Sequence, residues 1–156
     1  MTDPKDSYDR VFQRLEALCE GETDPIAIMA TIVCELYHAF DHFKWVGFYR
    51  NVVGGDLKIG PYQGGHGCLT IPFDRGVCGK CAREKKIQNV PDVLQIPHHI
   101  ACSSSTRSEI VVPVLGKDGR LIAVLDIDSD TPNAFNETDE KNLPKVCNWL
   151  EAAIAQ

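Results

Sequence analysis

Two apolar runs joined by a turn place the strongest constraint on how this chain can fold. Residues 110–115 and 121–128 are rich in β-branched side chains, as strands are, and Gly116-Lys117-Asp118-Gly119 between them has the composition of a turn. The two runs therefore predict an antiparallel hairpin. Their apolar character predicts that the hairpin is buried and that other elements cover it.

A second hairpin is predicted earlier in the chain. Residues 44–50 alternate as a strand does, and Val53-Gly54-Gly55-Asp56 favours a turn into a strand over residues 57–62. In the first of these strands Trp45 and Tyr49 lie on the same face, flanking a glycine. Two aromatic side chains placed in this way form either packed core or the wall of an apolar pocket, and the sequence leaves both interpretations open.

Helical spacing of apolar residues predicts helices before the first strands and after the last strand in the chain. The first is expected to be capped by Ser7, the second begins at Asp24-Pro25, and the last follows the capping-box pair Asn136 and Asp139. A short helix is expected near Cys78, where the helix dipole would lower the pKa of the thiol. This order predicts an α+β fold, an antiparallel sheet covered mainly on one face by its terminal helices.

Size and charge limit the class of protein. The 156 residues predict one domain over residues 1–156, and the net charge of −6 argues against a surface for nucleic acid. No apolar run approaches the roughly 20 residues of a membrane span. The first residues lack the basic and apolar regions of a secretory signal. We therefore expect a cytoplasmic protein that binds neither nucleic acid nor membranes.

The chain has seven cysteines, an odd number that cannot all pair. Without a signal peptide, a structural disulfide framework is not expected. Cys19, Cys34 and Cys147 fall within helical patterns, where a thiol behaves as a small apolar side chain. The remaining four lie in glycine-rich or loop segments of the middle third and need a chemical explanation: Cys68, Cys78, Cys81 and Cys102.

The segment from His98 to Pro113 begins as a polar, serine-rich loop and continues into the first apolar run. Cys102 lies in this loop, between His99 and the carboxylate of Glu109 at the start of the strand. Loops held by a rigid scaffold often carry chemistry, so a reactive Cys102 is one interpretation and an ordinary free cysteine is the other. On this segment alone both stay open.

Three classes of function fit these residues. The first is thiol redox chemistry, with a nucleophilic cysteine and resolving partners. The second is a zinc site on the CxxC pair Cys78 and Cys81, completed by histidines such as His66, His98 or His99, although no second ligand doublet follows. The third is a small-molecule sensor module without catalysis.

Several motifs in order resemble a GAF domain and, within that superfamily, the free methionine-(R)-sulfoxide reductases. The resemblance covers nearly the whole chain and is densest from residue 45 to residue 135. It rests on Gly60-Pro61-Tyr62-Gln63-Gly64 followed by Cys68, Gly76-Val77-Cys78-Gly79, Val90-Pro91-Asp92-Val93, His99-Ile100-Ala101-Cys102, Ser108-Glu109-Ile110-Val111-Val112-Pro113 and Leu125-Asp126-Ile127-Asp128-Ser129.

The resemblance implies a six-stranded antiparallel sheet with helices mainly on one face and a ligand pocket on the other. It implies Cys102 as the catalytic cysteine, Cys68 as the principal resolving cysteine and Cys78 as a secondary one. Trp45 and Tyr49 match the aromatic pair around the methyl-sulfur end of the substrate. The carboxylates that hold its polar end match Glu109, Asp126 and Asp128, and Glu109 and Asp128 are also candidates to assist at the sulfoxide oxygen.

The implied reaction is reduction of free L-methionine (R)-sulfoxide through a sulfenic acid and an intramolecular disulfide, as in defence against oxidative stress. It implies no metal and no other cofactor, thioredoxin or a similar dithiol as reductant, and a homodimer as one option for assembly. Two departures stand out: Ser103 where an aspartate often follows the catalytic cysteine, and the additional Cys81. The alternative is a non-catalytic GAF sensor, which the absence of a following effector domain disfavours.

Overall fold

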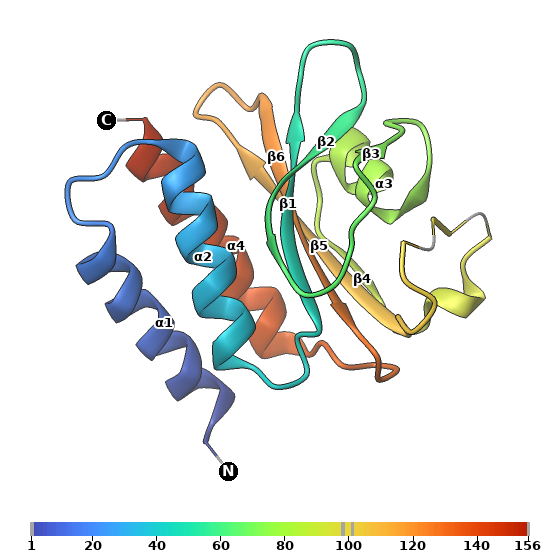
Figure 1. Ribbon diagram of the computed structural model, residues 1–156, viewed down its shortest axis with the longest axis horizontal. Helices are drawn as coiled ribbons and strands as arrows, with labels where there is room; N and C mark the ends of the chain where they lie inside the picture. The colour runs from blue at the N-terminus through green and yellow to red at the C-terminus, as the bar shows by residue number, and fades with distance from the viewer. Residues whose placement is uncertain (1, 98, 101, 156) are drawn as a thin grey trace.

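The computed structural model describes residues 2–97, 99–100 and 102–155, and Figure 1 shows the path of the chain. His98, which we considered beside the Cys102 loop and as a zinc ligand, lies outside the described residues. The helices and strands follow in the order α1 (Pro4–Leu18), α2 (Pro25–Ala39), β1 (Trp45–Asn51), β2 (Leu57–Gln63), β3 (Thr70–Ile71), α3 (Gly76–Glu84), β4 (Gln88–Val90), a 3-10 turn (Val93–Gln95), β5 (Ser108–Leu115), β6 (Leu121–Ser129) and α4 (Glu137–Ile154).

In the described part of the chain, six strands form one antiparallel sheet in the order β3-β2-β1-β6-β5-β4. The two predicted hairpins are β1–β2 and β5–β6, and the pairing of β1 with β6 joins them at the centre. The expectation of an α+β fold with a six-stranded antiparallel sheet is confirmed.

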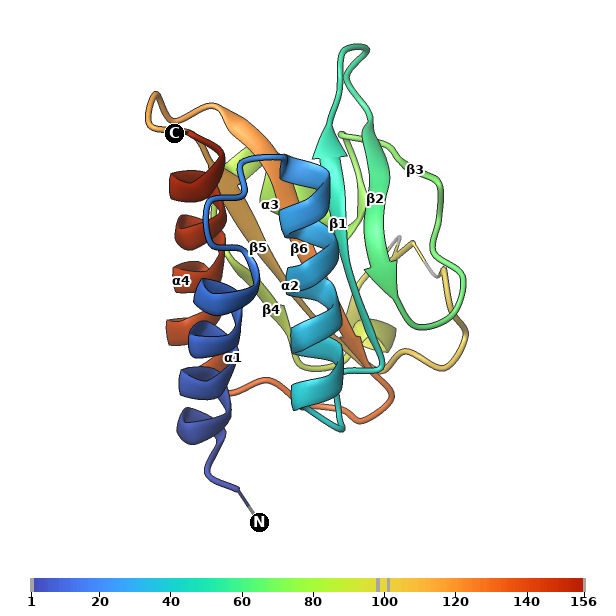
Figure 2. The same ribbon diagram turned by 60° about the vertical axis from the view of Figure 1, so that its left-hand side comes forward.

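Helices α1, α2 and α4 lie together on one face of the sheet, as Figure 2 shows. The strands turn alternate residues toward these helices, among them Phe48 on β1, Val112 on β5 and Ile127 on β6. Burying a side chain of this size contributes about 1.5–3 kcal/mol, so this layer is the main core.

The first helix begins earlier than we expected. Ser7 lies inside α1, and Asp3 caps the helix with Pro4 at its first position. Further along α1, the hydroxyl of Tyr8 donates to Asp139 Oδ1 at 2.7 Å. Asp139 also accepts from the backbone of Asn136 in the predicted capping box of α4, which is confirmed. The first and last helices are thereby joined through a buried polar contact.

The opposite face of the sheet carries α3 and a second, smaller cluster of buried side chains. Trp45 and Tyr49 from β1 and Val111 from β5 belong to this cluster. The short strands β3 and β4 form the two edges of the sheet. Residue patterns alone did not predict them, and we had expected residues 89–93 to form a loop. Among the helices that the structure describes, none combines the length and apolar character needed to cross a bilayer.

Candidate active site

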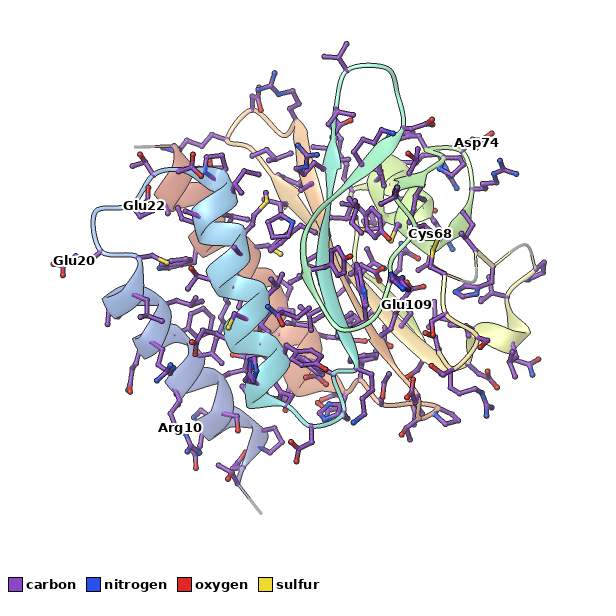
Figure 3. All side chains as sticks on the ribbon, viewed as in Figure 1. Arg10, Glu20, Glu22, Cys68, Asp74 and Glu109 are labelled. Carbon is purple, nitrogen blue, oxygen red and sulfur yellow. A yellow bond between two sulfur atoms is a disulfide. The ribbon has the colours of Figure 1, made fainter. Side chains whose placement is uncertain are left out.

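Three neighbouring strands bring the predicted carboxyl groups and an aromatic residue to one place. Asp126 and Asp128 lie on β6, and Glu109 on β5 pairs directly with Asp128. On the other side of β6, Trp45 of β1 also pairs with Asp128. Side chains opposite one another in a sheet lie about 4.5–5.5 Å apart at Cβ, so these groups form one cluster. Figure 3 shows Glu109 and Cys68 on the side of the sheet away from α1.

These side chains line a small cavity. Trp45, Tyr49, Glu109, Asp126 and Asp128 border it, and Cys102 closes it from the serine-rich loop. The space that remains has a volume of about 30 Å³, enough for one or two water molecules. The cavity is therefore narrow in this structure. The pocket predicted on the face away from α1, α2 and α4 is in this position.

A disulfide joins Cys68 to Cys102, with 5.4 Å between their Cα atoms. This is the pair that we expected to form in preference to any pair with Cys78. Cys68 follows the turn after β2, and Cys102 lies in the loop before β5. The bond therefore ties the two loops together at Cys102, which lines the cavity.

Cys78 and Cys81 are both free thiols, buried on α3. Our expectation of a lowered pKa for Cys78 was wrong. Burial, followed by the nearby charges of Asp126 and Glu109, raises the pKa of its thiol well above the ordinary value. A short helix dipole contributes about 0.3–1 kcal/mol at an exposed site, which is less than the cost of a buried thiolate among carboxylates. Burial also raises the pKa of Cys81, to about 12.

The pKa values of the three carboxyl groups are shifted in different directions. Burial by itself would raise the pKa of Glu109, but contacts with His99, Asp126 and Asp128 lower it below the usual value. His99 Nε2 lies 3.5 Å from Glu109 Oε1. Burial first, and then negative neighbours, raise the pKa of Asp126 and of Asp128 well above the usual value. We infer that Glu109 is the most readily ionised carboxyl group of the cluster, and that Asp126 and Asp128 hold their protons to higher pH than ordinary aspartic acids do.

Two oxygen atoms of this cluster have no hydrogen-bond partner. Oδ1 of Asp126 and Oδ1 of Asp128 are both buried, and no donor reaches either of them within the described residues. An unsatisfied buried oxygen costs about 1–3 kcal/mol, so the cluster is better suited to a polar ligand than to an empty state. The ligand must offer hydrogen-bond donors.

Aromatic rings form the opposite wall of the cavity. The rings of Trp45 and Tyr49 are stacked with 5.9 Å between centroids, and Tyr62 stacks on the outer face of Trp45 at 5.5 Å. Trp45 and Tyr49 are both buried and line the cavity, so they are core and pocket wall at once. Burial first, and then Asp126, raise the pKa of Tyr49, which keeps its hydroxyl neutral.

Residue reasoning missed several groups at this site. Tyr62 and the cavity-lining residues Ile71 and Thr106 were not predicted as site residues, and His66 was considered only as a zinc ligand. His66 lies between Gly65 and Gly67, two residues before Cys68, which is a local signal that could have placed it at the cavity. Thr106 gives no such signal, because only the fold of the loop brings it to the cavity.

One group of side chains has the geometry to hold a metal ion. The ligand atoms of Cys78, Glu109 and Asp126 all lie within 4.8 Å of one another. This group differs from the CxxC arrangement considered from the sequence, since it includes Cys78 without Cys81. Glu109 and Asp126 also line the cavity, whereas Cys78 is not among the residues that line it.

This six-stranded antiparallel sheet, with α1, α2 and α4 on one face and the cavity on the other, is that of a GAF domain, and the family model of the GAF domain matches residues 24–154. The chain belongs to the free methionine-R-sulfoxide reductase family of GAF proteins. It is 38% identical over 148 residues to the free methionine-R-sulfoxide reductase of Escherichia coli, an alignment that covers 95% of this chain and 88% of the relative.

Other similar proteins agree with this assignment. Protein YtsP of Bacillus subtilis is 43% identical over 155 residues, which cover 99% of this chain and 94% of YtsP. The X-ray structure of free methionine-R-sulfoxide reductase from Neisseria meningitidis in complex with its substrate superposes with a TM-score of 0.93 at 42% identity. That superposition covers 99% of this chain and 92% of the other.

Proposed function

We propose that this protein reduces free methionine (R)-sulfoxide to methionine, with Cys102 as the nucleophile. One observation carries the proposal: Cys102, which is joined to Cys68 by a disulfide, lines a cavity together with an aromatic pair and three carboxyl groups. The cavity offers a redox-active thiol pair, a surface for an apolar group and a binding site for a cation. The reductases of similar sequence support the same reaction. A non-catalytic sensor has less support, since sensing needs no disulfide at the pocket.

The cavity must widen from its present volume of about 30 Å³ to admit the substrate, and its lining favours one orientation. The ammonium group of the substrate pairs with the ionised Glu109 and offers hydrogen bonds to the unsatisfied oxygen of Asp126. Its methyl-sulfur end lies against Trp45 and Tyr49, whose faces favour an apolar group that carries partial positive charge. This orientation turns the sulfoxide sulfur toward Cys102.

Reduction of the sulfoxide takes an attacking thiolate and an acid. The Cys102 thiolate attacks the sulfoxide sulfur while an acid protonates the sulfoxide oxygen. We assign the acid to Asp128, because it lines both the cavity and the groove outside it together with Cys102. The oxygen leaves with the cysteine as a sulfenic acid, and the substrate, reduced by two electrons, leaves as methionine.

The disulfide forms in the next step. The Cys68 thiol attacks the sulfenic sulfur of Cys102 and water leaves, which yields the bond present in the structure. Thioredoxin or a similar dithiol in the cytoplasm then reduces this disulfide by exchange. We retain Cys78 as a secondary resolving cysteine. Its burial means that it reacts only when α3 or the loop beside it moves.

We also propose that residues 1–156 form a single domain.

The test is turnover of free methionine sulfoxide by the purified protein with thioredoxin, thioredoxin reductase and NADPH. We expect only the R epimer to be lost, and chiral chromatography measures the amount of each epimer. Binding of the R epimer without any turnover would favour the sensor instead. The native mass in solution, measured on the same preparation, tests the homodimer.

A further inference from the structure

The segment that carries Cys68 wraps around the indole of Trp45. We call residues 64–68 the resolving loop. The indole Nε1 donates a hydrogen bond to the carbonyl oxygen of Gly65 at 3.1 Å. The loop then passes the ring of Trp45 again at Gly67, immediately before Cys68. The Trp45 side chain therefore contacts the resolving loop near its start and again just before Cys68.

The close approach at Gly67 depends on the lack of a side chain. A Cβ atom there would lie 2.7 Å from Cζ2 of Trp45 and 2.8 Å from Cδ1 of Ile59, closer than real Cβ atoms come. Gly64 is similarly close to the indole, with 2.9 Å from its ideal Cβ position to Cδ1 of Trp45. Gly65, between them, has no atom within 4 Å of its ideal Cβ position.

Such a loop is costly to order without a partner. Glycine loses more backbone freedom on ordering than any other residue, and three of the five residues of the resolving loop are glycine. Cys68 must nevertheless come within bonding distance of Cys102. The hydrogen bond and the two close contacts with Trp45 are what offset this cost in the structure.

We propose that Trp45 is a positioning residue for the resolving step, in addition to its contact with substrate. Its indole holds the resolving loop so that the Cys68 thiol faces the sulfenic acid of Cys102. In this step the Cys68 thiol attacks the Cys102 sulfur, the sulfur–oxygen bond breaks, and water leaves with the proton of the thiol. The inference rests on the proposed function for the identity of the two cysteines.

The resolving step can be isolated from substrate reduction. Hydrogen peroxide oxidises the reduced protein at Cys102 to a sulfenic acid. Dimedone added at successive times traps the sulfenic acid that Cys68 has not yet converted to the disulfide. The ratio of trapped acid to disulfide over time gives the rate of resolution. Because no methionine sulfoxide is present, a failure here is distinguishable from a failure of the proposed function.

Two glycine variants form a matched pair. Gly67→Ala forces the loop away from the indole, whereas Gly65→Ala adds the same methyl group in open space and keeps the accepting carbonyl. Neither residue has a positive φ, so backbone strain does not separate them. Trp45→Phe keeps an aromatic ring and removes only the N–H donor and part of the ring.

We expect resolution at least tenfold slower in Gly67→Ala, at least fivefold slower in Trp45→Phe, and within twofold of the unchanged protein in Gly65→Ala. Equal rates in Gly67→Ala and Gly65→Ala would overturn the proposal. So would a Trp45→Phe protein that resolves at the unchanged rate. Circular dichroism of each variant identifies any that fails to fold, and the remaining variants then decide.

The fluorescence emission of Trp45 distinguishes positioning of the resolving loop from a role of Trp45 in stability alone. The chain has two tryptophans, so Trp149→Phe leaves Trp45 as the only emitter. Docking of the loop places a disulfide and a carbonyl beside the indole, so its emission should change when the protein is oxidised. Gly67→Ala should abolish this change and Gly65→Ala should retain it. An emission that does not respond to oxidation in the Trp149→Phe protein contradicts the proposal.

Discussion

Replacing Asp128 with asparagine should remove the proton that the sulfoxide oxygen needs while the cavity keeps its shape. Asparagine matches a protonated aspartic acid in size, and Oδ1 of Asp128 has no hydrogen-bond partner to lose among the described residues. A general acid typically contributes 10²–10⁴-fold to the rate, so we expect kcat at pH 7 to fall by about 100-fold or more. KM should change by less than about threefold, because ground-state contacts remain.

The same substitution has a thermodynamic consequence of known sign. Burial and the charge of Glu109 raise the pKa of Asp128 well above 3.8 in the folded protein. The stability that this group contributes is complete below its unfolded pKa and is lost as pH rises toward and through its folded pKa. The loss is about 1.4 kcal/mol for each pH unit in that window, hence up to about 2.7 kcal/mol between pH 5 and pH 7. Asparagine does not titrate, so the stability of Asp128→Asn relative to the unchanged protein should increase by up to this amount.

Two measurements test this reasoning. Steady-state kinetics with free methionine (R)-sulfoxide gives kcat and KM, and urea unfolding at pH 5, 6 and 7 gives the free energy of unfolding. Asp130→Asn is the control: Asp130 is exposed and its charge contributes to raising the pKa of Asp128. Removing that charge should move the alkaline limb of the rate profile to lower pH and leave the plateau unchanged. A kcat for Asp128→Asn close to that of the unchanged protein, or a stability difference that is constant with pH, would refute the assignment.

The remaining predictions concern the nucleophile, the substrate, the resolving cysteines and the fold. Cys102→Ser should abolish turnover in a protein whose circular dichroism is unchanged, and activity near that of the unchanged protein would remove this cysteine from the mechanism. N-acetylated methionine sulfoxide should be a poor substrate, since acylation removes the ammonium charge and leaves a buried carboxylate unpaired at a cost of about 1–3 kcal/mol or more; equal kcat/KM for both compounds would contradict the pocket. Cys68→Ser should accumulate the sulfenic acid while Cys78→Ser still forms the disulfide, and mapping of non-reduced peptides distinguishes the reverse assignment. Tyr8→Phe should lower the free energy of unfolding by about 1.5–3 kcal/mol, because it removes a hydrogen bond to the buried Asp139; urea denaturation measures this loss, and turnover should stay unchanged.

Local signals in the sequence predicted the parts of the fold that local energetics determine. Both long hairpins followed from turn composition between apolar runs, and the caps at Asp24 and Asn136 followed from side chains that bond their own helix. The start of α1 was missed, because Asp3 followed by proline competes with Ser7 as a cap and the nearer apolar pattern favoured the latter. The strands β3 and β4 are too short to show a period, and they exist through pairing with β2 and β5.

The candidate site was harder to predict from residues alone. The β5–β6 hairpin brings the carboxyl groups together, but the aromatic pair joins them only because β1 pairs with the other side of β6, and that strand order is a tertiary property. The resemblance to a known family supplied the site roles of these residues, whereas spacing left Asp126 and Asp128 open as ordinary strand-end residues. The pKa of Cys78 could not be predicted either, because the sequence places the residue near a helix start but does not reveal its burial beside Asp126.

The placement of the carboxyl groups on β5 and β6 also bears on how faithfully the chain folds. Neighbouring residues of these strands face opposite sides, so Ile127 packs under the helices while Asp126 and Asp128 face the cavity. A slip of β6 by one residue would bring both aspartates into the apolar layer beneath the helices, where an uncompensated charge costs several kcal/mol. This cost disfavours pairing of β6 in the wrong register during folding. An apolar replacement at Asp126 would accordingly remove a safeguard against misfolding as well as a group of the pocket, and slower or less complete refolding would be its signature.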